Sequence, residues 1–231
     1  MPDRPTGARA RARAQTIQDI KRVARLHLAS DGADLSLRSV ARELGMVSSA
    51  VYRYFESRDS LLTAIIIDAY DELGEATEQA EAAVRRSDLR GRWQATAHAI
   101  RDWSRAHPAE YGLLYGTPVP GYSAPHDTIG PASRPVVVMT AILRDGLERR
   151  ILVPGQHERL PAPTRSDLEG IIALPGFEGV TPALLARGMG VWAALFGLVS
   201  FELFGRLTNA VHDYDAWFDY QLRLLTRDLG L

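Results

Sequence analysis

Apolar residues recur at helical spacing along most of the chain. Their intervals of three and four residues predict a first helix from about Thr16 to Ser30, which Gly32 is placed to end in the left-handed conformation. No alternating run is long enough for a strand, and no segment is repeated. The pattern therefore predicts an all-α fold. The apolar series of the first helix is Ile17, Ile20, Ala24 and Leu28.

Two short helical patterns and one long pattern follow. Ser36 is placed to cap a helix over residues 37–44, which Gly45 would end. A second short helix is expected over residues 48–54. Ser57, with an acidic residue in the first turn, predicts the start of a long helix that runs through residue 73.

The rest of the chain alternates between helical patterns and proline-rich stretches. Two stretches, 117–135 and 153–182, each contain five prolines and are expected to be mostly loop, with a short helix over 166–173 in the second. Pro108 suits the first turn of another short helix. Longer helices are expected over residues 89–105, 136–152, 182–207 and 213–229.

Charge is distributed unevenly along the chain. Residues 1–60 carry 11 Lys or Arg against 7 Asp or Glu, a net charge of +4, whereas the remainder carries 16 against 21, a net charge of −5. A basic head on an acidic body predicts that a polyanion meets the N-terminal end. Residues 1–15, which place arginines among Ala, Pro and Gly, are expected to form a disordered basic arm.

Composition excludes several kinds of chemistry. The chain has no cysteine, which excludes disulfides, thiolate nucleophiles and cysteine-based metal sites. Its six histidines lack metal-ligand spacing, and no nucleophile–base pair or phosphate loop stands out, so no metal, cofactor or enzymatic activity is expected. The uncharged apolar run of 14 residues between Arg187 and Glu202 is shorter than the ~18 residues of a membrane span. A soluble, cytoplasmic protein is expected.

Residues 37–52 meet the steric demands of a helix-turn-helix. Two helices that cross steeply need a small residue where their backbones approach, and Ala41 supplies it. The tight turn needs a residue that tolerates positive φ, and Gly45 lies four residues further on. The second helix needs an apolar anchor, which Val51 provides. This spacing, A-x3-G-x5-V, predicts a DNA-binding helical hairpin.

The residues after this hairpin strengthen the prediction. Tyr52-Arg53-Tyr54-Phe55 is followed by a short turn with a basic residue and then by Leu61-Leu62. Over residues 16–62 the sequence resembles the DNA-binding head of the TetR family of bacterial transcription regulators. The resemblance implies a helix-turn-helix domain over residues 16–60 and a helical effector-binding and dimerisation domain over 61–231. Its departures from the family pattern are Arg58 in place of lysine, His27 in place of an aliphatic residue and Met46 at a position that is more often small.

By that resemblance, the helix over residues 48–54 enters the major groove of double-stranded operator DNA. Its N-terminal hydroxyls and alanine would face bases or phosphates, its tyrosine hydroxyls would reach phosphates, and arginines would neutralise backbone charge. Alternatively, Tyr54 only packs and Arg53 is a solvated charge. The arginines of the N-terminal arm fit minor-groove contacts and a solubilising tail equally well. The predicted DNA-binding residues are Arg38, Ser48, Ser49, Ala50, Tyr52, Arg53, Tyr54 and Arg58.

A palindromic operator requires a two-fold protein, so a homodimer is expected, with the last two helices as its interface. Residues 192–199 are apolar nearly all round the helix, which predicts burial on both sides. Residues 192–197 also resemble the W-x-x-x-H-G signature of one C-terminal domain type in the family, with Phe196 in place of the histidine. The predicted interface comprises Trp192, Phe196, Gly197, Phe204, Trp217, Phe218, Leu222 and Leu225.

The resemblance also implies a ligand pocket between the middle helices. An aromatic, mostly apolar cavity would suit a lipophilic small molecule, although plain core is the stronger explanation for any one of these side chains. The predicted lining consists of Trp93, Trp103, Tyr111, Tyr115, Met139 and Phe177.

These features predict a homodimeric repressor that a lipophilic small molecule releases from its operator. Two alternatives remain at this point. The first is a DNA-binding regulator without a small-molecule ligand, either constitutive or controlled by a protein partner. The second is an all-helical enzyme or scaffold that carries the same head. The glycines around Met189 do not form a nucleotide loop in this interpretation, because no strand precedes them.

Overall fold

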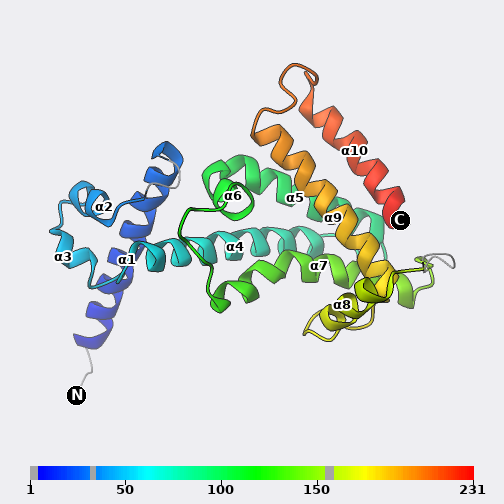
Figure 1. The fold of residues 1–231 in the computed structure, drawn as a ribbon, viewed down its shortest axis with the longest axis horizontal. Helices are drawn as coiled ribbons and strands as arrows, with labels where there is room; N and C mark the ends of the chain where they lie inside the picture. Colours follow the sequence, from blue (N-terminus) through cyan, green and yellow to red (C-terminus); the bar gives the residue numbers. More distant parts are fainter. Residues whose placement is uncertain (1–4, 32–34, 154–158) are drawn as a thin grey trace. The chain divides into compact units, whose positions relative to one another are not determined.

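A computed structural model describes residues 5–31, 35–153 and 159–231 (Figure 1). Among these residues it contains ten α-helices, one short 3-10 helix and no strand, which confirms the all-α prediction. The helices are α1 (Pro5–Asp31), α2 (Leu37–Glu43), α3 (Ser48–Val51), α4 (Arg58–Ala82), α5 (Leu89–Ala106), α6 (Pro108–Tyr115), η1 (His126–Thr128), α7 (Ile129–Glu148), α8 (Ala162–Ile172), α9 (Pro182–Leu203) and α10 (Tyr214–Leu229).

The helices form two compact units. The first unit contains residues up to Tyr70 together with His107–Ile129, and the second contains Asp71–Ala106 together with Gly130–Leu231. The head predicted over residues 16–60 is therefore part of a larger unit that also takes in the start of α4, the short helix α6 and the loop that follows it.

The first unit is built around one hydrophobic core. Apolar residues of α1, α2, α3 and the start of α4 converge there, and Val119 reaches the same core from the loop after α6. Burying these side chains stabilises the short helices α2 and α3, which are too short to persist alone in water. Core residues with no exposed surface include Ile20, Ala24, Val40, Val51, Leu61, Leu62 and Ile65.

Ion pairs join α1 to α4 and α6 in this unit. The ammonium of Lys21 lies 2.8 Å from both carboxylate oxygens of Asp68, and only 12% of the Lys21 side chain is exposed. The guanidinium of Arg25 lies 3.7 Å from Asp68 and 3.8 Å from Glu110. These contacts hold the outer face of α1 where the apolar core does not reach.

Helix α1 begins about eleven residues before the predicted start at Thr16. Residues 5–15, expected as a disordered arm, are helical, so that expectation is wrong for this stretch. Alanine and arginine have high helix propensity, and this segment alternates between them, so it extends the buried helix without burying apolar surface of its own. Residues 7–15 are exposed. Arg4 and the predicted cap Gly32 lie outside the described residues.

Helices α3, α7, α8 and α9 also differ from their predicted bounds by three residues or more. Helix α3 ends at Val51 instead of residue 54, because the backbone N–H groups of Tyr54 and Phe55 both donate to the Val51 carbonyl and close a tighter turn. Helix α7 begins at Ile129, well before residue 136, and contains Pro135 in its interior. A proline there costs one backbone hydrogen bond but does not end the helix, and the proline-rich pattern had suggested a loop.

The second unit has a large core that contains buried polar pairs. Arg92 has no exposed side-chain surface and donates to Asp145 at 2.6 Å, while Trp93 donates from its indole nitrogen to the Thr226 hydroxyl at 3.1 Å. Burial raises the pKa of Asp145, but the hydrogen bond and charge of Arg92, aided by Arg86, outweigh burial and leave that pKa below its ordinary value. These pairs fix α5 against α7 and α10.

Candidate nucleic-acid interface and C-terminal unit

Helices α2 and α3 form a helix-turn-helix. Ala41 is buried where the two helices meet, and the Met46 N–H donates to the Ala41 carbonyl at 2.9 Å. Gly45 has a φ of +66° in the turn, as its position in the motif predicted, and Val51 is fully buried. The steric roles predicted for these three residues are confirmed.

The predicted DNA-binding residues lie on this hairpin, in the turn after it and at the start of α4. Arg38, Ser49, Tyr52 and Arg53 are exposed, and the other four of the eight are partly exposed. All eight are thus accessible on the surface of the first unit while Val51 faces the core. The arrangement presents hydroxyl and guanidinium groups together, which suits contact with phosphates and base edges.

The exposure of Val47 and the placement of Arg13 beside Tyr54 were not predicted from the sequence. Val47 precedes α3 and is 70% exposed, an unusual exposure for an aliphatic residue. The Arg13 guanidinium carbon lies 5.0 Å from the centroid of the Tyr54 ring, in cation–π geometry. The exposure of Val47 leaves no mark in the sequence pattern, and the Arg13 contact exists only because residues 5–15 are helical.

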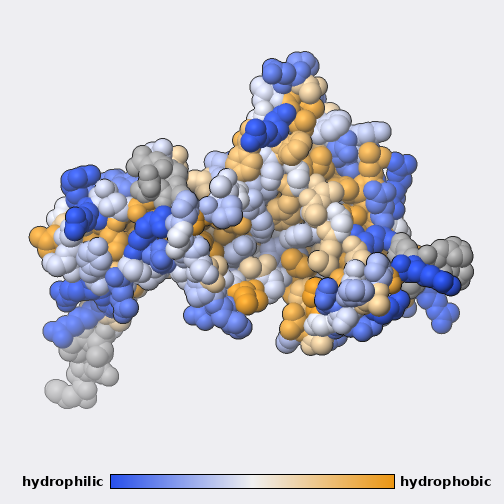
Figure 2. All heavy atoms as spheres, in the orientation of Figure 1, coloured by the Kyte–Doolittle hydropathy of each residue, from blue (hydrophilic) through white to orange (hydrophobic). Residues whose placement is uncertain are grey.

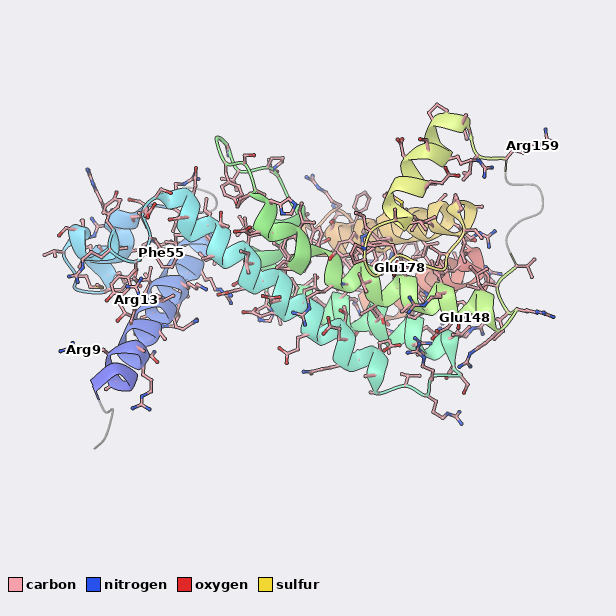
Figure 3. The ribbon with its side chains drawn as sticks, turned by 90° about the horizontal axis from the view of Figure 1, so that it is seen from below. Arg9, Arg13, Phe55, Glu148, Arg159 and Glu178 are labelled. Carbon is pink, nitrogen blue, oxygen red and sulfur yellow. The ribbon has the colours of Figure 1, made fainter. Side chains whose placement is uncertain are left out.

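The first turns of α1 form a basic helical segment. Arg9, Arg11 and Arg13 are exposed, and no acidic residue occurs on α1 before Asp19. Arg9 and Arg13 stand one turn apart in Figure 3. The segment therefore places at least two positive charges on the side of the unit that carries Tyr54.

Tyr54 and His27 also have structural roles. Tyr54 is partly buried against the hydrophobic core, so packing accounts for part of its environment. The imidazole Nε2 of His27 lies 2.6 Å from a Glu43 carboxylate oxygen and links α1 to α2. This pairing explains how a polar residue is accommodated where the family usually has an aliphatic one.

The six predicted pocket residues are distributed over both units and are mostly packed as core. Tyr111 and Tyr115 belong to the first unit, and the other four belong to the second. Between 0% and 9% of the surface of Trp93, Trp103, Tyr111, Met139 and Phe177 is exposed.

Tyr115 lies in an aromatic cluster. Its ring packs edge-on to Tyr70, with centroids 6.1 Å apart, and lies 5.2 Å from Tyr111. Burial, with a smaller contribution from Tyr70 and Tyr111, raises the pKa of the Tyr115 phenol. Three cavities among the described residues are lined by other side chains, so the plain-core alternative is favoured for these aromatic residues.

The predicted dimer residues divide into two groups. Phe196, Phe218, Leu222 and Leu225 are buried within a single chain, between 1% and 9% exposed, because the apolar stripes of α9 and α10 pack on each other and on α5. These four are core residues, and their placement at a surface is corrected. Trp192, Gly197 and Trp217 are partly exposed, and Phe204 is 46% exposed.

Helix α9 keeps a second, outward apolar face. By length and composition alone it is apolar enough to cross a membrane, yet 39% of its most apolar window is buried inside the chain. A core helix of a globular protein passes the same test. Orange and pale residues cover much of the surface over α9 in Figure 2. Its outward residues include Met189, Ala193, Ala194, Gly197 and Phe201.

Together, the exposed α3 surface and the separate helical unit define the class of helix-turn-helix DNA-binding regulators. A family model for bacterial regulatory proteins of the tetR family matches residues 22–65. A second model, described as a tetracyclin repressor-like C-terminal domain, matches residues 93–225. The chain belongs to the TetR family of transcriptional regulators and is not an enzyme.

Individual relatives agree with this assignment. The HTH-type transcriptional regulator Rv1816 of Mycobacterium tuberculosis is 39% identical, and the match covers 97% of this chain and 96% of the relative. Mb1846 of Mycobacterium bovis matches to the same extent.

Solved structures also align over nearly the whole chain. The regulatory protein SCO4313 is 30% identical, with a TM-score of 0.76 and coverage of 94% of this chain and 97% of that one. PfmR, a TetR family regulator from Thermus thermophilus, shares the fold at 18% identity, with a TM-score of 0.60 and coverage of 90% and 97%.

Proposed function

We propose that this regulator acts as a homodimer that represses transcription by binding a palindromic operator, and that a small molecule releases it. The observation that carries the DNA-binding part is the outward face of α3, where Ser49, Tyr52 and Arg53 are exposed while Val51 anchors the helix in the core. A short helix anchored in this way fits the major groove. Such a protein works where the DNA is, in the bacterial cytoplasm.

Within this proposal, the exposed residues divide between positioning and recognition. Arg38, Arg53 and Arg58 neutralise phosphates, and the hydroxyls of Tyr52 and Tyr54 donate to phosphate oxygens. The residues proposed to face base edges are Val47, Ser48, Ser49 and Ala50. Serine hydroxyls read bases weakly, whereas Val47 and Ala50 can contact a thymine methyl group, so part of the recognition is apolar.

The basic first turns of α1 extend the proposed DNA surface. Arg13 is held over the Tyr54 ring, beside a residue already proposed to contact a phosphate, and Arg9 follows one turn away. A helical segment presents guanidinium groups to the phosphate backbone without threading an extended arm into the minor groove. This replaces both alternatives considered for a disordered arm.

The outward apolar face of α9 supports the homodimer. Phe201 and Phe204 are 52% and 46% exposed, and no Lys, Arg, Asp or Glu occurs between Arg187 and Glu202. Exposed apolar surface of this kind marks a protein contact, and a two-fold dimer buries the same patch on both copies. Two recognition helices would then reach successive major grooves ~34 Å apart.

A test of the DNA proposal removes hydroxyls without disturbing the core. Tyr52→Phe with Tyr54→Phe should weaken binding to the regulator's own promoter by roughly thirtyfold, because each of the two hydroxyl–phosphate hydrogen bonds contributes about 1 kcal/mol. Fluorescence anisotropy against labelled promoter DNA measures this change. Unchanged affinity in the double variant would show that the two hydroxyls do not touch DNA.

The basic segment of α1 is tested through the salt dependence of binding. Arg9→Ala with Arg13→Ala should flatten the slope of log affinity against log salt by up to ~0.9 for each phosphate that the protein no longer neutralises. The matched control, Arg149→Ala with Arg165→Ala, removes the same charge from exposed positions in the second unit. Equal slopes for the two variants would contradict a local role for α1.

A further inference from the structure

A cavity of about 410 Å³ lies between α5 and α10, within the second unit. Its volume falls in the range of sites that hold small organic molecules. Helix α5 contributes Arg90 and Gln94, and α10 contributes Tyr220, Arg223, Leu224, Thr226 and Arg227. None of the aromatic residues predicted to form a lipophilic pocket lines it.

The cavity wall is positively charged, whereas the part of the chain that contains it has a negative net charge. Arg90, Arg223 and Arg227 face the cavity, and no carboxylate is among its lining residues. Residues 61–231 carry a net charge of −5, with 16 basic residues against 21 acidic ones. Three arginines gathered without an acid are therefore a local departure, and they repel one another unless an anion joins them.

Several other arginines of this unit are paired with acids. Arg92, Arg101 and Arg134 each bind carboxylates at 2.5–2.8 Å. By contrast, among the described residues no Asp or Glu side chain lies within ion-pair distance of the cavity arginines.

The cavity arginines are nevertheless held in place. Arg90 donates to the main-chain oxygen of Leu231 at 3.0 Å, and the Arg223 guanidinium carbon lies 5.6 Å from the centroid of the Tyr220 ring. Two of the three acids of α10 are engaged elsewhere, since Asp215 pairs with Arg101 and Asp219 lies 3.3 Å from His98, and the third, Asp228, does not line the cavity. The guanidinium groups therefore keep N–H donors that a bound anion can accept from.

The wall of the cavity connects to the buried core. Thr226 is 1% exposed, and its hydroxyl donates to the Leu222 carbonyl at 2.6 Å while it accepts from Trp93 at 3.1 Å. A molecule in the cavity would contact both α5 and α10 beside this hydrogen bond. Leu224 and the Tyr220 ring offer apolar surface next to the charged groups.

We propose that this cavity binds an organic anion, with its carboxylate or phosphate group held by Arg90, Arg223 and Arg227 and its apolar portion against Tyr220 and Leu224. The inference rests on the proposed function in that it names the chemical class of the effector. It replaces a purely lipophilic effector with one that carries a negative charge. Binding of such a molecule bridges α5 and α10 and neutralises the repulsion among the three arginines.

The test measures binding to the full-length protein in the absence of DNA. Adenosine diphosphate probes the phosphate arm, benzoate probes the carboxylate arm, and uncharged adenosine is the control. At least one anion should bind saturably by titration calorimetry and raise Tm, whereas adenosine should do neither. Arg223→Ala with Arg227→Ala should weaken that binding by roughly tenfold or more, since charge-assisted hydrogen bonds are removed.

Matched variants and a separate DNA assay make the outcome decisive. Arg149→Ala with Arg165→Ala changes the total charge equally outside the cavity and should leave anion affinity unchanged. The proposal is overturned if neither anion binds at millimolar concentration, or if both double variants bind it like the unmodified protein. Since promoter binding is measured without any anion, its failure would count against the proposed function alone.

Discussion

Gly45 shows how far a single backbone conformation determines the DNA-binding hairpin. Its φ of +66° lies in the left-handed region, and a Cβ at this position would meet no atom within 4 Å. The constraint is therefore conformational and not steric crowding. Glycine adopts this region freely, whereas a residue with a Cβ is strained there by roughly 1–2 kcal/mol.

Gly45→Ala should lower the free energy of unfolding by about 1 kcal/mol, because the strain in the turn outweighs the entropy that alanine removes from the unfolded chain. Gly45→Asn should lose less, since asparagine tolerates the left-handed region better. Urea unfolding of both variants measures the two values. Equal stability of the alanine variant and the unmodified protein would mean that the turn relaxes to another conformation.

At the same scale, residue roles were predicted correctly where one local structural requirement can be met by only one type of residue. Ala41, Gly45 and Val51 were identified because small size, positive φ and an apolar anchor are fixed by the hairpin alone. Val47 was missed because its 70% exposure depends on how α3 is oriented, which spacing does not reveal. Phe218 was predicted to lie at the dimer interface but is buried within one chain. An apolar stripe on a helix does not reveal whether the residues that pack on it belong to the same chain or to a partner.

Among the elements, α9 is used on two sides. Its inner side approaches α7 so closely that a Cβ on Gly188 would lie 2.9 Å from a Leu143 methyl carbon. Its outer side carries the exposed apolar residues described above. The glycines around Met189 thus lie inside a helix, which excludes the nucleotide-loop geometry for this segment.

Gly188→Ala should destabilise the protein by roughly 1–3 kcal/mol, because Leu143 must move within a packed core to make room. The matched control is Gly170→Ala on α8, where the added Cβ meets nothing within 4 Å and higher helix propensity should raise stability by up to about 1 kcal/mol. Thermal unfolding of the two variants should therefore shift Tm in opposite directions. If Gly188→Ala stabilises the protein instead, the space between α7 and α9 accommodates the added methyl group.

The bounds of the helices were predicted best where an apolar stripe runs to a cap. Helix α10 begins after Asp213, whose carboxylate accepts from the Ala216 N–H, and it ends before Gly230, whose φ is +93°. Helices α1 and α7 begin before their predicted starts because helix propensity and neighbouring turns extend each helix at its N-terminal end. The added segments have no apolar face, so the apolar pattern did not predict them. Pro135 indicated a break by composition, but in the helix it removes only one hydrogen bond.

For the whole molecule, the outward face of α9 makes a specific prediction about assembly. Phe201→Glu should convert the proposed dimer to a monomer, because two charges would be buried at a two-fold contact. Sedimentation velocity measures the change, and promoter affinity should fall with it. The matched control is Leu174→Glu, since both parent residues are 52% exposed. A dimeric Phe201→Glu protein would place the subunit contact elsewhere.

The fold class and the DNA-binding head could be predicted from the sequence, whereas the proposed anion site could not. The head depends on contacts between residues close in the chain, so its motif is local. The Arg90, Arg223 and Arg227 cluster joins positions more than a hundred residues apart, and only tertiary structure brings them to one cavity. Large aromatic residues were predicted to line a pocket because of their size. Large side chains also fill a packed core, so size alone does not distinguish a pocket from a core.

The lone lysine has a practical consequence for following conformational change. Because Lys21 is engaged with both oxygens of Asp68 and the sequence has no thiol, a cysteine introduced at the exposed Ser30 would be the single maleimide-reactive position in each subunit. In the proposed dimer, dyes attached there would report the separation of the two heads by energy transfer. The distance between the two dyes could be recorded with and without operator and anion. No other reactive side chain has to be removed first, because the chain has no cysteine of its own.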